Sequence, residues 1–567
     1  MEDKRTGLAI VLCILVVMVY SELFIAPYTR PPQQVSQGEA QVPKSNKENV
    51  EIPVMEPVSG TPAQVAAQVS EPVTQVKSEQ HLPPPGIEEI NNSGLITIDS
   101  ANFKAVLSKL GGRLLHFELK NYFEHLDSDQ RHDLIMKREG AALPLGLYTS
   151  KWNDARVSYA LTEVSTPPVG ENSYQLLPGQ SLALTFEGKT PDQDNSIKKI
   201  FRFHSDSYLF DLNVNLAKPN GDGSPVWLEW TQFVPTAHVT NRYNPEGFTF
   251  LHSDNSRQTV LISDVENTME NAGSNIWLSY AEKYFMVALI PGTAQQNSTY
   301  GGVAVDGELE SDSQFPKGHL YYLRAKGAPQ ISNFSVFAGP KVYRTLKQSG
   351  FQLERSIDLG VFSFLAFPLL AAIHFFYGIF GNYGLAIILL TLLIKTIFLP
   401  LNAASMKNMR AMQELQPEMK ALRERIKDPT QLNQEMAALF KRRGVNPMGG
   451  CFPMLIQIPV FLGLYSGLLN SIELRHAPFA LWIRDLSAPE YLHVAGLSIP
   501  VMVLLMGASM FIQMKTSPQS PDPVQQKVAL AMPIIFTAIF IVVPMPAGLV
   551  LYWLVNNLIS ITQSVYL

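Results

Sequence analysis

The pattern of hydrophobic and polar positions changes several times along the chain. Apolar residues fill much of the first 26 positions, and long apolar runs return after Gly384. Between these regions, short runs alternate, as in Tyr208–Leu216, where Phe210, Leu212 and Val214 share one face. Alternation with a period of two predicts β-strands that bury one face. Apolar runs of about 20 residues predict helices that cross a bilayer.

These patterns divide the chain into five regions. Residues 27–90 are rich in Pro, Gln and Ser, with no aromatic residue between Tyr28 and Phe103, which indicates a disordered segment. The regions are an N-terminal signal-anchor transmembrane helix (1–26), a Pro/Gln-rich tether (27–90), a large all-β sandwich exported across the membrane (91–342), an amphipathic interfacial helix region (343–382) and a core of five transmembrane helices (383–567) that includes a cytoplasmic helical hairpin (402–446). A cleaved signal peptide is the alternative for the first region, but no clean small-x-small cleavage site precedes Pro27.

Charge sets the orientation that we expect in the membrane. Only 16% of the residues are charged, whereas about 25% is typical of soluble proteins. The segment between Leu401 and Cys451 has a net charge of +4, while Ser471–Val494 has −1, and positive loops stay in the cytoplasm. A span at Leu359–Phe380 would put the positive loop outside, so we place that aromatic-rich segment on the outer interface. Six spans result, with both termini in the cytoplasm.

The positive loop carries its own helical pattern. Met406, Met409 and Met412 begin an apolar stripe with spacings of three and four, and Asp428-Pro429 offers an N-cap before a second helix. We expect two antiparallel helices, whose methionines either hold the hairpin together or also meet varied apolar segments. The basic residues of this hairpin are Lys407, Arg410, Lys420, Arg423, Arg425, Lys427, Lys441, Arg442 and Arg443.

One lysine, Lys395, lies inside the apolar run Gly384–Leu401. A cation at the centre of a span costs about 2.5–3.5 kcal/mol on insertion scales and usually faces a polar cavity, although Lys395 could also reach the nearby headgroups. Thr391 lies one helical turn earlier. Other polar residues of the spans are Gln457 and the stripe formed by Trp553, Asn556, Asn557 and Ser560. They could line the same polar cavity, or they could simply form hydrogen bonds between helices. The core spans contain no acidic residue, which favours a wet pocket over an ion pair.

The β-region offers little sign of catalysis. Gly188-Lys189-Thr190 lacks the earlier glycine of a phosphate-binding loop, because Ala183 stands there. The histidines His204, His238 and His252 lack metal-ligand spacing, so we expect no metal and no cofactor. The presence of only two cysteines, Cys13 and Cys451, argues against a disulfide framework, and the net charge of −5 argues against a nucleic-acid function.

Three strings resemble the signatures of the YidC family of membrane protein insertases. They are Asn446–Phe461 (NPMGGCFPMLIQIPVF), Glu473–Ser487 (ELRHAPFALWIRDLS) and Gly548–Asn557 (GLVLYWLVNN). The resemblance implies a five-span core around a hydrophilic groove that is closed toward the outside, and a β-supersandwich in the periplasm of a Gram-negative bacterium. The groove cation of the family is typically an arginine, and Lys395 occupies its position.

The sequence also differs from the family pattern at three places. Leu399 and Trp553 stand where some members have tyrosine, and the chain stops at Leu567 without the basic tail of many members. We therefore expect the hairpin to make the ribosome contact. The partners implied are nascent membrane proteins, the Sec translocon, the ribosome and the lipid bilayer of the inner membrane.

The sequence thus predicts a non-enzymatic insertase and chaperone, whose groove carries the short polar flank of a nascent hydrophobic segment. A membrane transporter is one alternative, but paired intramembrane charges and two similar halves are not visible. An envelope carbohydrate-active enzyme, with the β-region as its catalyst and the spans as its anchor, is the other.

Overall fold

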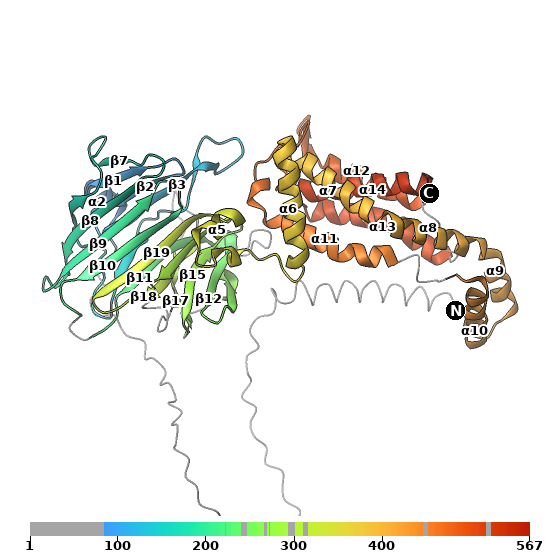
Figure 1. Cartoon of the computed structure of the whole chain (residues 1–567), viewed down its shortest axis with the longest axis horizontal. Coiled ribbons are helices and arrows are strands. Elements are labelled where there is room, and N and C mark those ends of the chain that lie inside the picture. The colour runs from blue at the N-terminus through green and yellow to red at the C-terminus, as the bar shows by residue number, and fades with distance from the viewer. Residues whose placement is uncertain are drawn as a thin grey trace, which may run out of the picture. The chain divides into compact units, whose positions relative to one another are not determined.

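The computed structural model describes residues 84–566 except for 221–222, 240–245, 266–268, 272, 293–300, 310–315, 446–451 and 517–522. The expected signal anchor and nearly all of the expected tether lie outside the described residues, as does the start of the first signature string. The described residues contain a β-domain followed by a helical region (Figure 1).

The β-domain consists of three antiparallel-rich sheets. Their strand orders are β4-β3-β2-β1-β7, β13-β12-β15-β16-β19-β10-β9-β8-β6 and β14-β17-β18-β11-β5. The strands are β1 (Leu95–Asp99), β2 (Phe103–Ser108), β3 (Arg113–Phe123), β4 (Arg131–Asp133), β5 (Gly146–Tyr148), β6 (Ala160–Val164), β7 (Ser173–Gln175), β8 (Ser181–Lys189), β9 (Ser196–His204), β10 (Leu209–Leu216), β11 (Trp227–Pro235), β12 (Gly247–His252), β13 (Arg257–Leu261), β14 (Met269–Asn271), β15 (Asn275–Ala281), β16 (Phe285–Pro291), β17 (Gly301–Leu309), β18 (Gly318–Lys326) and β19 (Ile331–Pro340). Short helices α2 (Ile87–Asn92), α3 (Thr236–Val239) and η3 (Ile262–Asp264) accompany them.

Aromatic side chains join the nine-stranded sheet to both smaller sheets. Phe117 of β3 stacks on Phe210 of β10 with 6.0 Å between ring centroids, and Phe248 of β12 lies 5.8 Å from Tyr321 of β18. The alternation predicted for Tyr208–Leu216 is confirmed, because every second residue of β10 is buried. Sheets packed face to face through alternating apolar residues form a sandwich.

The helical region begins where the β-domain ends. Its elements are α5 (Tyr343–Ser349), η4 (Leu353–Ser356), α6 (Ser363–Phe380), α7 (Tyr383–Ile397), α8 (Leu399–Glu414), α9 (Gln416–Arg425), α10 (Pro429–Arg443), α11 (Phe452–Asn470), η5 (Ile472–Leu474), β20 (Leu492–Val494), β21 (Leu497–Ile499), α12 (Val501–Thr516), α13 (Pro523–Val542) and α14 (Ala547–Tyr566). A second apolar core lies among α6, α7, α11, α12, α13 and α14. A large β-domain followed by a helical region agrees with the predicted fold class.

The run predicted to reach Leu401 as one span is bent instead. α7 ends at Ile397, and α8 begins at Leu399 after a bend of 60°. Pro400 occupies the first turn of α8, where its missing N–H costs no hydrogen bond. The helix therefore changes direction before Pro400 and continues into the hairpin.

The hairpin has the predicted cap and an additional break. Asp428 accepts hydrogen bonds from the backbone N–H groups of Thr430 and Gln431, so the predicted N-cap of α10 is confirmed. The first predicted helix is split between α8 and α9 at Leu415. Leu415, Met419 and Leu439 are buried against one another, which is the packing expected if apolar side chains hold the hairpin together.

The described residues contain few helices that could cross a bilayer by length and composition. Among them, α6 alone is long and apolar enough by itself, and α7 with α8 meets the same criteria as a bent pair. Part of α11, the whole of α12 and part of α13 form shorter apolar helices. The predicted count of six spans and the interfacial position of Leu359–Phe380 therefore stay predictions.

Candidate functional site

The helix that carries Lys395, α7, is fixed at its N-terminal end. Asn382 caps α7 by accepting a hydrogen bond from the N–H of Leu385, and its Nδ2 donates to the carbonyl of Phe479 at 3.0 Å. Gly384 lies so close to Phe479 that a Cβ atom there would overlap the ring. These contacts tie the start of α7 to the loop that follows α11.

Lys395 lies at the opposite end of α7 and does not extend to the surface. Its side chain is only 5% exposed, and its Nζ donates to Ser560 Oγ on α14 at 2.7 Å. Ser560 in turn donates to the carbonyl of Asn556 at 2.8 Å. Among the described residues, no carboxylate forms an ion pair with Lys395, and Ser560 is its one hydrogen-bond partner. The ammonium has three N–H donors, so it retains hydrogen-bonding capacity that no described side chain uses.

Further polar contacts extend along α14. Gln457 Nε2 of α11 donates to Asn556 Oδ1 at 2.6 Å, and Asn402 Nδ2 of α8 lies 3.4 Å from Gln563 Oε1. We call the residues Lys395, Asn402, Gln457, Asn556, Ser560 and Gln563 the polar seam. The seam joins four helices, α7, α8, α11 and α14, through side-chain hydrogen bonds. Polar contacts of this kind are the usual way in which membrane helices accommodate polar groups.

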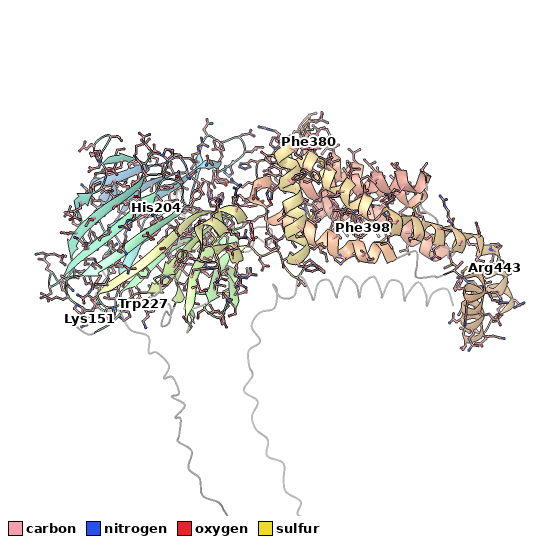
Figure 2. The ribbon with its side chains drawn as sticks, viewed as in Figure 1. Lys151, His204, Trp227, Phe380, Phe398 and Arg443 are labelled. Atoms are coloured by element: carbon pink, nitrogen blue, oxygen red, sulfur yellow. The ribbon has the colours of Figure 1, made fainter. Side chains whose placement is uncertain are left out.

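A small cavity lies beside the seam at the bend between α7 and α8. Its volume is about 10 Å³, close to the space of one water molecule. Lys395, Asn402 and Gln457 supply its polar lining, and Ile394, Phe398, Leu401 and Ile456 supply the rest. Phe398 marks this part of the bundle in Figure 2. A buried ammonium therefore borders a cavity with amide groups opposite.

The other predicted site residues take different positions. Thr391 is 1% exposed, and its hydroxyl donates to the carbonyl of Ile387 in its own helix at 2.7 Å. Asn557 faces α12, where its Nδ2 donates to Ser509 Oγ at 3.0 Å. Trp553 packs on Phe461 with 5.0 Å between ring centroids. The structure brings Lys395, Gln457, Asn556 and Ser560 together, while Thr391, Asn557 and Trp553 lie outside the hydrogen-bonded seam.

Sequence reasoning missed Asn402, Ser509 and Gln563. Gln563 lies seven residues after Asn556, so continuing the α14 stripe by one step would have found it. Asn402 lies directly after Leu401, the last residue of the predicted apolar run. The bend before Pro400 brings α8 alongside the end of α14 instead.

The predicted basic residues of the hairpin are mostly exposed. Arg423 is the one that is partly buried, and the others among the nine are exposed. Arg443 forms an ion pair with Glu418, and Arg442 lies 3.6 Å from Glu435. The hairpin therefore presents a surface with excess positive charge.

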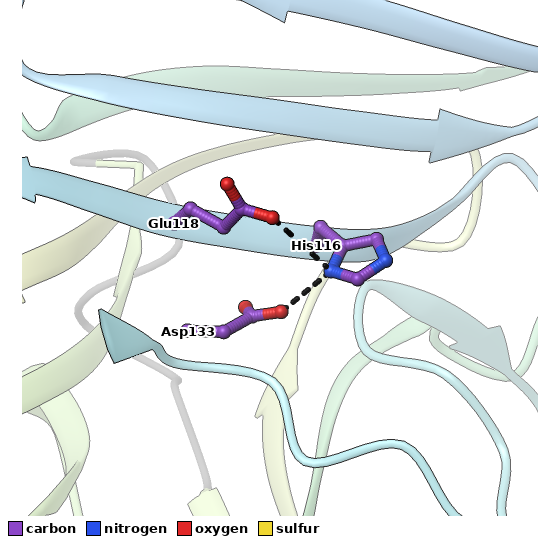
Figure 3. Close-up of side chains that lie close together, drawn as sticks. All are labelled: His116, Glu118 and Asp133. Atoms are coloured by element: carbon purple, nitrogen blue, oxygen red, sulfur yellow. Dashed lines mark hydrogen bonds and ion pairs between the residues drawn. The ribbon is translucent and has the colours of Figure 1, made fainter. Parts of the chain in front are cut away.

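A histidine cluster in the β-domain was not foreseen. His116, Glu118 and Asp133 lie on the paired strands β3 and β4, with ligand atoms within 4.8 Å of one another (Figure 3). Lys137 Nζ lies 2.6 Å from His116 Nε2, and His116 Nδ1 lies 2.6 Å from Asp133 Oδ2. An ammonium is always a donor, so Nε2 accepts and Nδ1 carries the proton that Asp133 binds. The cluster is thus a hydrogen-bonded chain in which Nδ1 is not free for a metal ion.

The fold and the seam define a class of protein: an apolar helical bundle with a buried lysine and amide side chains in its interior, joined to a large β-domain. Two family models match the chain. The model described as YidC periplasmic domain matches residues 95–372, and the model described as 60Kd inner membrane protein matches residues 375–567.

Relatives match over the whole length. A membrane protein insertase YidC of Syntrophus aciditrophicus (strain SB) is 36% identical over 100% of this chain and 99% of its own length. That of Pelobacter propionicus is 35% identical with the same coverage. The chain therefore belongs to the YidC family of membrane protein insertases, proteins of the bacterial inner membrane with a periplasmic domain.

A solved structure also matches in part. The active YidC insertase crystal structure with its first transmembrane domain resolved is 20% identical, with a TM-score of 0.36, over 83% of this chain and 92% of that chain. These values are too low to transfer any detail of the site.

Proposed function

We propose that this chain inserts hydrophobic segments of nascent membrane proteins into the inner membrane, and that the polar seam receives their polar flanks. The buried, incompletely hydrogen-bonded ammonium of Lys395 beside the cavity is the observation that carries the proposal. The names of the full-length relatives support insertion over transport or carbohydrate chemistry.

The physical task is to lower the cost of moving a polar flank into hydrocarbon. Each unsatisfied polar group costs several kcal/mol there. The amides of Gln457, Asn556 and Asn402 can exchange their mutual hydrogen bonds for bonds to such a flank. Lys395 adds a cation that attracts acidic side chains in particular. The hydrophobic segment that follows gains free energy when it moves from water into lipid.

The membrane arrangement belongs to the same proposal. Five core spans, α7, α11, α12, α13 and α14, with an N-terminal anchor would place the positive hairpin in the cytoplasm, as the charge of its loop favours. Both termini are then cytoplasmic, and α6 lies on the outer interface. The exposed basic residues of the hairpin suit a ribosome surface, and the Sec translocon is the second proposed partner.

The role of Lys395 is tested with substitutions that separate charge from geometry. The variants are Lys395→Arg, Lys395→Ala and Lys395→Glu, each scored for insertion of one client with an acidic outer flank and a matched client with a neutral flank. Lys395→Glu should reduce insertion of the acidic client by about tenfold or more, corresponding to roughly 1.4 kcal/mol or more. Lys395→Arg should keep most activity. Equal insertion by the Glu variant and the wild type would refute the cation's role.

A crosslinking experiment locates the path. A photoreactive residue at Gln457 or Asn556 should crosslink to a stalled nascent chain, whereas one at the exposed Phe375 of α6 should do so far less. The reverse pattern would place the path outside the seam.

A further inference from the structure

The loop after α11 contains a short turn, η5, whose residues enter two separate hydrophobic cores. Ile472 is 2% exposed and belongs to the core of the β-domain. Leu474 is 1% exposed and belongs to the core of the helical bundle. Ile472 and Leu474, the residues directly before and after Glu473, therefore anchor the same turn in two different cores.

The β-domain holds this turn by an arginine as well. Arg475 Nη2 donates to the carbonyl of Glu124 at 2.9 Å, and its guanidinium lies 5.3 Å from the centre of the Phe285 ring. Arginine is suited to this position, because its planar guanidinium can donate a hydrogen bond and stack on an aromatic face at the same time. Arg475 is thus held from the loop between β3 and β4 and from β16.

The bundle side of the turn is held by polar contacts. Glu473 accepts a hydrogen bond from Ser471 Oγ at 2.7 Å and lies 3.5 Å from His374 Nε2 of α6. α11 itself packs tightly on α6, since a Cβ atom at Gly467 would lie 3.2 Å from Leu370. Small residues such as Gly467 let two helices pack closely. A force on η5 therefore acts on the outer end of α6 and α11 together.

We propose that η5 is a joint through which the β-domain fixes the outer end of α11. α11 also carries Gln457, thirteen residues before its end at Asn470, or about 20 Å along a helix. By fixing α11, the joint keeps Gln457 of the polar seam positioned against Asn556 of α14. The mechanical link stands on the contacts alone, and only its relevance to insertion rests on the proposed function.

The joint is tested first by amide hydrogen exchange on the full chain in lipid nanodiscs. In Ile472→Asp, a charge enters the core of the β-domain, and in Arg475→Ala, both contacts of the guanidinium are lost. Both variants should speed exchange by about tenfold in residues 471–476 and in residues 122–125. Arg484→Ala is the matched control, because its ion pair with Asp127 joins the same two parts but is 62% and 70% exposed, so exchange should change less than about twofold. Wild-type exchange in both variants would overturn the joint.

The effect on the seam is measured by disulfide formation, which does not depend on insertion. Cysteines replace Gln457 and Asn556 in a chain in which Cys13 and Cys451 are serine. Arg475→Ala should lower the yield of this crosslink at least about twofold, and Arg484→Ala should leave it unchanged. An unchanged yield together with faster exchange would overturn the link from the joint to the seam, whatever the outcome of the insertion tests.

Discussion

Among the described residues, two lysines are buried, one in the β-domain and one in the helical region, and they differ in how many hydrogen bonds their ammonium groups form. Lys199 of the β-domain is fully buried and pairs with Asp154 Oδ2 at 2.6 Å. It also donates to the carbonyls of Gly111 at 2.8 Å, Gly112 at 3.2 Å and Leu145 at 3.0 Å. Lys395 has a single described hydrogen bond, to Ser560.

The difference separates a structural charge from one that is available for binding. A buried ion is tolerated when its hydrogen-bonding capacity is satisfied, and Lys199 meets this condition through four oxygen partners. Arg113 strengthens the arrangement by binding the other side of Asp154 at 2.9 Å. In the part of the chain that the structure describes, Lys395 has Ser560 alone as a hydrogen-bond partner and borders a cavity, which is the basis for the binding role proposed above. The number of satisfied donors, rather than burial, distinguishes the two sites.

Removal of the Asp154 carboxylate, which Lys199 and Arg113 share, should cause the largest loss of stability. Asp154→Ala leaves Lys199 and Arg113 buried without their partner, which should lower the free energy of unfolding by about 3–5 kcal/mol. Chemical denaturation of the full chain, followed by tryptophan fluorescence, measures this loss. Asp129→Ala is the control, because Asp129 is exposed and should change stability by less than about 0.5 kcal/mol. A loss below about 1 kcal/mol in Asp154→Ala would show that the network contributes little.

A partly exposed acid, Glu282, should have an intermediate, pH-dependent effect on stability. Burial of its carboxyl group, with the nearby Glu246 carboxylate, raises the pKa of Glu282 to about 7 from 4.5. Because the folded pKa is raised, its contribution to stability is fully present below about pH 4.5 and is lost as the pH rises through 7. Glu282→Gln, which mimics the protonated acid, should therefore stabilise the chain by about 1–2 kcal/mol at pH 8 and have little effect at pH 5.

Thermal unfolding of the wild type and of Glu282→Gln at both pH values checks this expectation. Lys283→Gln, a change at the neighbouring position, controls for the loss of one charge. An equal shift at pH 5 and pH 8 would mean that Glu282 does not titrate in this range.

The smallest effect on stability is expected at the seam. Lys395→Met should change the free energy of unfolding by less than about 1 kcal/mol, because Ser560 still donates to Asn556 and no charge is left unpaired. Denaturation under the conditions used for Asp154→Ala gives a direct comparison. A loss as large as that of Asp154→Ala would make Lys395 a structural residue like Lys199.

The sequence predicted those features that depend on local periodicity. The alternation of β10 and the cap at Asp428 follow from spacing and residue type, and both are observed. The stripe on α14 also led to Asn556 and Ser560, since residues four apart share a helix face. Lys395 and Gln457 were singled out as polar residues in apolar runs, and the structure places both against that stripe.

Contacts between distant residues could not be predicted in this way. Lys199 meets the carbonyl of Gly111 and the carboxylate of Asp154 across long stretches of chain, and no repeat in the sequence relates them. Thr391 has the right spacing from Lys395, but its hydroxyl binds the backbone of its own helix. The two-sided anchoring at Ile472 and Leu474 depends on which core each side chain reaches, and that is a property of the packed chain.

The close approach of Gly384 to Phe479 leaves no room for even a methyl group. Alanine at this position would push the start of α7 away from the loop that follows α11, at the end of α7 opposite Lys395. Gly384 thus sets how closely this loop packs on α7. A single added carbon would weaken that contact without replacing any polar side chain of the seam.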